Sequence, residues 1–310
     1  MAELELSALK EILKSPEDAV RAAEEDYKNK INGVAELIVK SGKIRVILLA
    51  GPSGSGKTTT ANLLCDRIKA LGERSMVVSM DDFYMDLSNP AYPTLEDGTR
   101  DLESPHSLDV AELLSTLEGI VTGKPFTVPK YDFKVGRRVA LCSYDSFADG
   151  CVIMEGIHGL NPMFSSPFDK DSILKLFVSV STNINTEGVR IISGKKMRFV
   201  RRLVRDSIYR GTGAERTLDM WKNVLMGEEI HLYPYKEQAD VKLDTFHVFE
   251  PAVMKPYAMR LLTDEVVKGS PYAAVVRSAL SEVPEYGSEL VPETSLIKEF
   301  IPGGIYEHLY

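Results

Sequence analysis

Cysteine is scarce in this chain of 310 residues, and long apolar runs are absent. The three cysteines, Cys65, Cys142 and Cys151, are odd in number and lie 77 and 9 residues apart, which fits neither a disulfide framework nor a paired zinc-ligand pattern. We expect them to be small buried residues. The longest apolar run, Val46 to Ala50, is far shorter than the roughly 20 residues of a membrane-spanning helix. The acidic amino terminus has no basic region before an apolar stretch, so we expect no leader, no membrane partner and a cytoplasmic location.

Basic residues are outnumbered, with 37 Lys and Arg against 45 Asp and Glu and a formal net charge of −8. A surface for nucleic acid or an anionic membrane needs clustered Lys and Arg, so we expect no nucleic-acid partner and only a local basic cluster. A chain of this length can bury a sizeable core without disulfides or metals. The composition leaves open whether the chain forms a homo-oligomer.

Short β-branched runs alternate with amphipathic segments between residues 41 and 270, a pattern typical of an α/β fold whose parallel sheet is covered by helices on both faces. We expect strands over residues 44–50, 75–80, 151–154 and 173–180. We expect helices over residues 57–71, 107–123 and 195–228, the last broken near 211–213.

Three further segments lie outside this alternation. Residues 1–40 have apolar positions at helical spacing and predict a helical extension that packs on the domain and carries no chemistry. Residues 124–145 predict a hairpin around Lys134-Val-Gly136. Residues 271–310 contain four prolines and predict a meandering tail against the domain, on its own or a neighbouring subunit.

The most specific motif is Gly51-Pro-Ser-Gly-Ser-Gly-Lys-Thr58, which fits G-x-x-x-x-G-K-[ST] between a predicted strand and a predicted helix. Glycines let backbone N–H groups converge on phosphate oxygens, and the helix amino terminus favours an anion. Lys57 would reach the outer phosphates, and Thr58 offers a hydroxyl to Mg²⁺. The sequence therefore predicts a site for ATP and Mg²⁺. The expected cradle comprises Gly51, Ser53, Gly54, Ser55, Gly56, Lys57, Thr58 and Thr59.

Carboxylates follow two of the predicted strands, where ligands collect in open α/β sheets. Asp81 and Asp82 come after the second strand, and Asp81 is our candidate for the base that takes a proton from an attacking hydroxyl. The alternative is that both acids only cap the next turn. Glu155 ends another strand and would help to hold Mg²⁺ with Thr58 and Asp81, or would simply cap its strand.

Four arginines, Arg198, Arg201, Arg202 and Arg205, recur at helical spacing, so that a helix would place them on one face. Arg210 follows before Gly211. Guanidinium groups suit the charge of a transferring phosphoryl group, so we expect Arg205 and Arg210 to take part in catalysis. A solvated charged helix is the alternative.

Together these motifs resemble the uridine kinase and phosphoribulokinase family of P-loop kinases over residues 43–260. The matching strings, in order, are Gly51 to Thr58, Ser79 to Tyr84, Pro129-Lys-Tyr-Asp-Phe133, Glu155-Gly-Ile157, and Arg201-Arg-Leu-Val-Arg-Asp206 through Arg210-Gly211. Glu155 to Pro162 and Glu299 to Gly304 resemble signatures of a bacterial uridine kinase-like branch that carries an appended amino-terminal region, which we expect to be missing here apart from the helical stretch.

The resemblance implies a P-loop NTPase three-layer fold with a parallel central sheet, helices on both faces, a small β-hairpin excursion and a helical lid. The kinase domain would cover residues 41–270, with lid helices at 195–228. It implies that Asp81 is the general base, and that the acceptor is contacted by Tyr84, Glu103, Tyr131, Phe133 and Arg202. Arg202, Arg205 and Arg210 would form the phosphate-clamping lid.

Several positions depart from the family pattern. Gly136 and Met220 stand where uridine kinases have a His and a Gln that contact the pyrimidine, and Thr212 replaces a second lid arginine. A pocket discriminates a base by polar partners that would otherwise go unpaired, so these losses bear on the acceptor. His158 resembles a phosphoribulokinase feature, or is a structural histidine.

The resulting hypothesis is an ATP-dependent kinase of a small hydroxyl acceptor, most simply the 5′-hydroxyl of uridine or cytidine. Two alternatives stay open: a kinase of a non-nucleoside sugar, sugar phosphate or polyol, and a nucleotide-binding regulatory protein without an acceptor. A guanine-reading Asn-Lys-x-Asp string is absent from the sequence, which makes a GTPase switch a weaker alternative.

Overall fold

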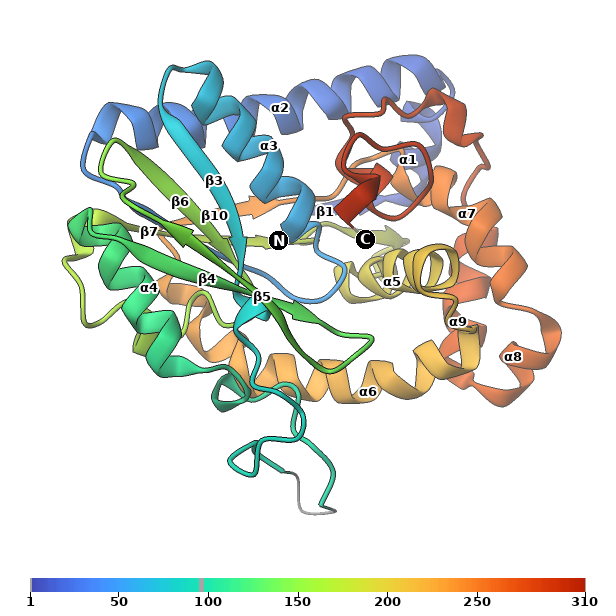
Figure 1. The fold of residues 1–310 in the computed structure, drawn as a ribbon. Coiled ribbons are helices and arrows are strands. Elements are labelled where there is room, and N and C mark those ends of the chain that lie inside the picture. Colours follow the sequence, from blue (N-terminus) through green and yellow to red (C-terminus); the bar gives the residue numbers. More distant parts are fainter. Residues whose placement is uncertain (1, 95–97, 310) are drawn as a thin grey trace.

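The computed structural model describes residues 2–94 and 98–309, and its centre is a five-stranded parallel sheet (Figure 1). The strand order is β10-β7-β2-β6-β3. The strands are β2 (Val46–Ala50), β3 (Arg74–Ser79), β6 (Gly150–Glu155), β7 (Ile173–Ser179) and β10 (Val241–Asp244). The predicted parallel sheet and the P-loop NTPase three-layer fold are confirmed, while β10 is a strand that the sequence did not predict.

Alternate side chains of β2 enter two different cores, because successive residues of a strand point to opposite faces. Ile47 and Leu49 pack with the helices α2 (Pro16–Ser41) and α3 (Lys57–Ala70). Val46 and Leu48 pack with α4 (Val110–Thr122). The sheet is therefore covered on both faces, as its near-continuous apolar strands require.

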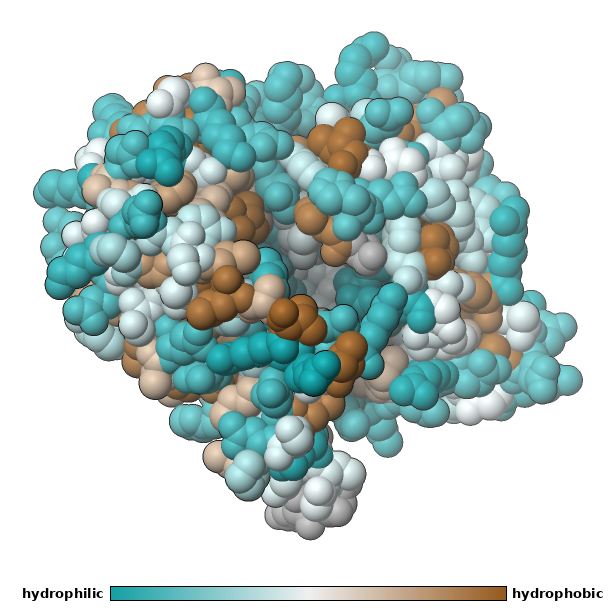
Figure 2. Space-filling model, in the orientation of Figure 1, coloured by the Kyte–Doolittle hydropathy of each residue, from teal (hydrophilic) through white to brown (hydrophobic). Residues whose placement is uncertain are grey.

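The predicted hairpin consists of β4 (Phe126–Asp132) and β5 (Arg137–Tyr144), which pair with each other outside the main sheet. Its turn contains Gly136 at φ +72°, in the left-handed region that glycine adopts without strain. The hairpin exposes apolar side chains, and brown residues gather over this part of the surface in Figure 2. These side chains are Phe133, Val135, Val139 and Leu141.

A small second sheet joins the amino terminus to the middle of the chain. In it, β1 (Glu3–Glu5) pairs in parallel with β8 (Asn183–Thr186), which pairs with β9 (Val189–Ile192). The sequence predicted only helix over residues 1–40, and β1 departs from that. A three-residue strand is specified by its partner about 180 residues away, which no local pattern reveals.

Of the remaining helices, α1 comes from the amino terminus and the others from the carboxyl half of the chain, and α7, α8 and α9 lie together at one side of the molecule (Figure 1). The α-helices are α1 (Leu6–Ile12), α5 (Gly194–Arg210), α6 (Ala214–His231), α7 (Glu250–Leu261), α8 (Asp264–Gly269) and α9 (Pro271–Ser281). Short 3-10 turns cover Met80–Phe83, Pro105–Ser107, Pro162–Phe164, Lys170–Ser172, Tyr233–Gln238, Ser288–Leu290, Leu296–Glu299 and Glu307–Leu309. Within the described ranges, no helix combines the length and the apolar character that crossing a membrane requires.

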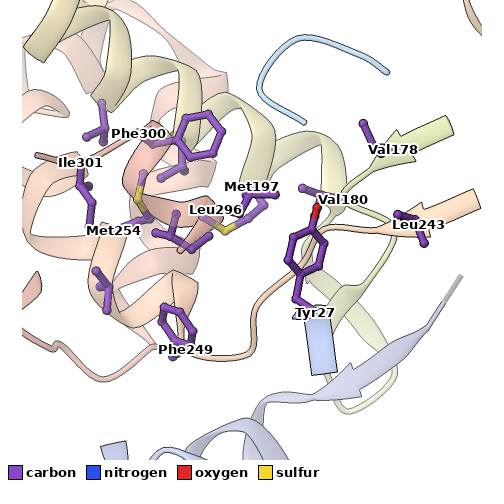
Figure 3. Close-up of a cluster of buried hydrophobic side chains, with 14 of the residues drawn as sticks. Tyr27, Val178, Val180, Met197, Leu243, Phe249, Met254, Leu296, Phe300 and Ile301 are labelled. Atoms are coloured by element: carbon purple, nitrogen blue, oxygen red, sulfur yellow. The ribbon is translucent and has the colours of Figure 1, made fainter. Parts of the chain in front are cut away.

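Residues 271–309 are more regular and more buried than a meandering tail. They begin with the helix α9, and their later part inserts Leu296, Phe300 and Ile301 into the core. Figure 3 shows these three side chains beside Met197 of α5 and Met254 of α7. The carboxyl-terminal segment is thus part of the main core on its own chain.

Two of the cysteines meet the expectation from the sequence. Cys65 and Cys151 are buried, whereas Cys142 lies on the hairpin strand β5 and is only half-buried. Burial raises the pKa of the Cys151 thiol to about 11, so this side chain stays a protonated apolar residue at neutral pH.

Candidate active site

The P-loop turns tightly between β2 and α3. A Cβ on Gly51 would lie 2.2 Å from the carbonyl oxygen of Val178, and Gly54 has φ +72° with its Cβ position 2.7 Å from the Arg198 carbonyl oxygen. Only glycine fits at both places. The first intrahelical bond of α3 runs from the Thr60 N–H to the Gly56 oxygen at 3.0 Å, so the preceding N–H groups have no acceptor within the helix.

A cavity of about 230 Å³ opens at this loop, and Figure 2 shows the face hollowed near its centre. The predicted residues that line the cavity are Ser53, Gly54, Ser55, Gly56, Lys57, Thr58, Asp81, Tyr84, Glu103, Glu155, Arg202, Arg205 and Arg210. The cavity thus brings together residues of four separate motifs: the P-loop, the turn after β3, the end of β6 and the arginines of α5. Ile157, Val224 and Glu299 also line it and were not predicted.

Four predicted residues lie outside the cavity wall. Gly51 only begins the loop, and Thr59 is buried in the first turn of α3, where its N–H donates to Glu299 Oε2 at 3.2 Å. Tyr131 and Phe133 form an aromatic cluster with the cavity residue Tyr84, with ring centroids 5.0–5.8 Å apart. This cluster extends from the cavity onto the hairpin.

Asp81 and Asp82 are adjacent but have different surroundings. Asp81 lines the cavity, and burial raises the pKa of its carboxyl, an effect that the nearby Lys57 partly reverses. Asp82 accepts the Tyr131 N–H at 3.2 Å and pairs with Lys130 Nζ at 2.5 Å. Asp82 therefore holds the hairpin, and Asp81 is the acid of the two that faces the cavity.

Glu155 lies at the end of β6, where its Oε1 accepts a hydrogen bond from the Ser79 hydroxyl at 3.2 Å. Burial raises the pKa of Glu155 to about 7, against the lowering effect of Lys57. In the described part of the chain, no three His, Cys, Asp or Glu side chains converge into a ready-made metal cage. Thr58, Glu155 and Asp81 are instead the kind of ligands that Mg²⁺ commonly has in proteins. The ion is then bound by one or two carboxylates, and water molecules and substrate phosphates complete its coordination.

Arg198 and Arg201 lie on α5 with Arg202 and Arg205, as the spacing predicts, but they do not line the cavity. Their side chains are 1% and 0% exposed. Arg198 bonds both oxygens of Glu228 at 2.8 Å, and Arg201 forms a two-point pair with Glu250. The spacing along the chain does not distinguish these two arginines from the other two. They are buried because Glu228 of α6 and Glu250 of α7 pair with them.

These buried pairs also hold the P-loop from behind. Arg198 Nη1 donates to the Ser53 oxygen at 2.8 Å, and Arg201 Nη1 donates to the Gly54 oxygen at 3.3 Å. Glu228 Oε1 accepts the Ser53 N–H at 2.9 Å. The cradle is therefore braced by charged hydrogen bonds, which are stronger than neutral ones.

The other three arginines line the cavity and share one carboxylate. Asp206 is 3.2 Å from Arg202, 3.0 Å from Arg205 and 3.3 Å from Arg210. Arg202 also donates to the Ser53 hydroxyl at 2.8 Å. Burial lowers the pKa of Arg210 to about 10, which still leaves it charged at neutral pH. One carboxylate neutralises only one guanidinium, so this wall stays positive and suits phosphate oxygens.

Glu103 lines the cavity as a further buried carboxylate. Burial raises the pKa of its carboxyl to about 7, while Arg202 lowers it. The neighbouring Tyr84 hydroxyl donates to the Leu102 oxygen at 2.7 Å. Gly136 and Met220, the two departures from the uridine kinase pattern, do not line this cavity.

His158 is buried behind the site, with its ring 5.9 Å from that of His231. Burial lowers the pKa of His158 to about 3, so it is neutral. Neither ring nitrogen has a hydrogen-bond partner in the described part of the chain. The structure gives this histidine no place in the cavity wall.

The sequence model of the phosphoribulokinase / uridine kinase family matches residues 46–249, which include the central sheet, the P-loop and the arginine helix. The chain belongs to this family. Residues of the carboxyl-terminal segment, Glu299 among them, lie outside the matched part.

Individual relatives are moderately distant. The chain is 27% identical to a uridine kinase of Deinococcus deserti over 69% of its length and 94% of that protein, and 30% identical to a uridine kinase of Lactobacillus helveticus over 63% and 84%. It is 27% identical over 63% of its length to uridine kinase-like protein 5 of Arabidopsis thaliana, of which the match covers only 38%. A solved structure of a possible uridine kinase from Bacillus stearothermophilus aligns with 71% of this chain and all of that chain, at 18% identity and a TM-score of 0.42.

Proposed function

We propose that this family member transfers the γ-phosphoryl group of ATP to a hydroxyl group, most simply the 5′-hydroxyl of uridine or cytidine. The observation that carries the proposal is the meeting of Lys57, Asp81 and Arg205 in one cavity at the P-loop. A phosphate-binding lysine, a buried carboxylate and a positive wall are the parts that phosphoryl transfer to an alcohol needs.

The P-loop and α3 would bind the phosphates through backbone N–H groups, with Lys57 at the outer ones. Thr58 and Glu155 would hold Mg²⁺, which supplies charge neutralisation on the phosphate oxygens. Ser55 supports a ligand here, because its hydroxyl is fully buried and has no hydrogen-bond partner among the residues that the structure describes.

In the transfer step, the acceptor oxygen forms a bond to the γ-phosphorus as the bond from that phosphorus to the bridging oxygen breaks and ADP leaves. Asp81 takes the proton of the attacking hydroxyl. Arg202, Arg205 and Arg210 stabilise the charge on the transferring group. A lid movement of α5 to exclude water stays a prediction.

The residues that would select the acceptor are Glu103 and the aromatic cluster beside the cavity. The aromatic cluster of Tyr84, Tyr131 and Phe133 offers ring faces to a planar base, and Glu103 can accept hydrogen bonds from sugar hydroxyls. The names of the bacterial relatives support a pyrimidine nucleoside. Gly136 and Met220 favour the second candidate, a sugar, sugar phosphate or polyol, because neither supplies a polar contact to a base.

An acceptor panel tests the proposal. ADP release from MgATP would be measured with uridine, cytidine, pentoses, sugar phosphates and inositols, using Lys57→Ala as the inactive control. We expect strong stimulation by uridine or cytidine and none with the control. If only a polyol stimulated ADP release, the acceptor would be a polyol and not a nucleoside. ATP hydrolysis that no acceptor stimulates would indicate a regulatory nucleotide-binding protein. A cytoplasmic location stays a prediction.

A further inference from the structure

Glu299 is an acid of the nucleotide cavity that comes from the carboxyl-terminal segment. Its side chain is 4% exposed and lines the cavity with Lys57 and Thr58. Its Oε2 accepts the Thr59 N–H at 3.2 Å, across 240 residues of sequence. Nothing in the mechanism proposed above uses this carboxylate.

The segment around Glu299 is anchored, so the carboxylate is held in place. Leu296 lies against the P-loop, where a Cβ on Gly56 would come within 2.7 Å of its Cδ1. Phe300 packs under the Arg201 guanidinium, 5.0 Å from the ring centroid to Cζ, and Ile301 is fully buried. Figure 3 shows Leu296, Phe300 and Ile301 together in the core below the loop.

The Thr59 N–H is a donor that a nucleotide would also need. Because the helical bonds of α3 start with the Thr60 N–H, Thr59 carries the last N–H before the ladder begins. The N–H groups at such a helix start, which have no acceptor within the helix, are those that a P-loop presents to phosphates. A carboxylate and a phosphate are both anions, so they compete for this donor and repel each other at short range.

We propose that Glu299 is an intrachain competitor of the triphosphate. Nucleotide entry displaces its carboxylate from the Thr59 N–H, and the displacement loosens the carboxyl-terminal segment that carries it. This inference rests on the ATP site of the proposed function and is independent of the acceptor. It couples occupancy of the P-loop to the packing of residues 295–301.

Glu299→Gln is the decisive variant, because the amide keeps an oxygen that can accept the Thr59 N–H but carries no charge. Glu293→Gln is the matched control, since Glu293 is an exposed acid of the same segment and does not line the cavity. The dissociation constant of ATP would be measured by calorimetry with and without Mg²⁺. We expect Glu299→Gln to bind metal-free ATP about tenfold more tightly than the unaltered protein, with a smaller gain for MgATP, and Glu293→Gln to change neither.

Two results with this variant overturn the inference. Unchanged ATP affinity would make Glu299 only a helix cap, and weaker MgATP binding would make it a metal or positioning ligand. If the unaltered protein bound no ATP, the proposed function and this inference would fall together. Failure of uridine or cytidine in the acceptor panel would leave this test intact.

Hydrogen exchange on the unaltered protein decides the matter even if Glu299→Gln does not fold. The Lys298 N–H bonds the Ser295 oxygen at 3.1 Å, and the Phe300 N–H bonds the Ile297 oxygen at 3.0 Å. We expect these amides to exchange several-fold faster when ATP is bound. Equal or slower exchange with ATP would overturn the coupling.

Discussion

The adjacent carboxylates of Asp81 and Asp82 differ in their surroundings, and we expect them to differ in function. Asp81 faces the cavity with a pKa raised by burial, whereas Asp82 is occupied by Lys130 and the Tyr131 N–H. We expect Asp81→Asn to lower kcat by about 10³-fold, because general-base catalysis contributes on that order. ATP affinity should change little. Steady-state kinetics with the acceptor from the panel, together with calorimetry of ATP binding, measures both.

Asp82→Asn is the matched control for this experiment. It removes one charge from the neighbouring position, and we expect a small effect on kcat because that side chain does not reach the cavity. Equal losses in the two variants would contradict the base assignment and would indicate that both acids act through the shape of the turn.

The element that organises the site is α5, which carries arginines with two different tasks. The Arg201 pair with Glu250 is completely buried beneath the P-loop. Removing one partner of a buried ion pair leaves an uncompensated charge, so we expect Glu250→Gln to lower the free energy of unfolding by about 3–5 kcal/mol. Urea denaturation measures the change.

Glu36→Gln provides the comparison, because Glu36 meets Arg67 at 3.9 Å on the surface. An exposed pair contributes about 0–1 kcal/mol, so this variant should unfold almost as the unaltered protein does. A loss of stability in Glu250→Gln no larger than in Glu36→Gln would show that the buried pair does not brace the loop.

A second element, the hairpin, exposes the aromatic side chain of Phe133. This ring is 66% exposed and lies 5.0 Å from Tyr131 and 5.8 Å from Tyr84. Loss of one stacking contact is worth roughly 0.5–1.5 kcal/mol, so Phe133→Ala should raise the KM of a nucleoside acceptor about 3- to 10-fold with Tm unchanged. Val139→Ala, also exposed on the hairpin, should leave KM as it is. An unchanged KM in Phe133→Ala would favour a polyol acceptor.

For the molecule as a whole, Glu24 links three distant parts of the chain. This α2 side chain bonds the Ser295 hydroxyl at 2.5 Å and lies 3.8 Å from His247 Nε2. Burial raises the pKa of Glu24 to about 7 from 4.5, whereas burial lowers the pKa of His247 to about 3, so the histidine is neutral. A carboxyl group whose pKa is raised by folding stabilises the fold in its protonated form. This contribution is complete below pH 4.5, the ordinary pKa, and is lost as pH rises through 7, the pKa in the folded protein.

Glu24→Gln removes that titration. We therefore expect the Tm of the unaltered protein, relative to that of Glu24→Gln, to fall between pH 5 and pH 8. Calorimetric melting of both proteins in matched buffers measures the difference. A difference that stays constant, or grows with pH, would contradict the burial of a neutral Glu24.

The sequence by itself determined the parts of this protein that are local along the chain. The P-loop and the Asp81 turn are runs of consecutive residues, and the alternation of strands and helices follows from periods of two and about 3.6 residues. Chain connectivity fixes such spacings before any folding occurs. The cradle, the candidate base and the parallel sheet were therefore accessible without coordinates.

Only the tertiary structure decided which charged residues meet. Arg198 and Arg201 have the same helical spacing as Arg202 and Arg205, but Glu228 and Glu250 neutralise them inside the protein. Glu299 enters the cavity from 240 residues beyond Thr59, and the string Glu299 to Gly304, although it resembles a family signature, does not predict that contact. Burial and ion pairing depend on neighbours in space, and the packing of distant segments brings those neighbours together.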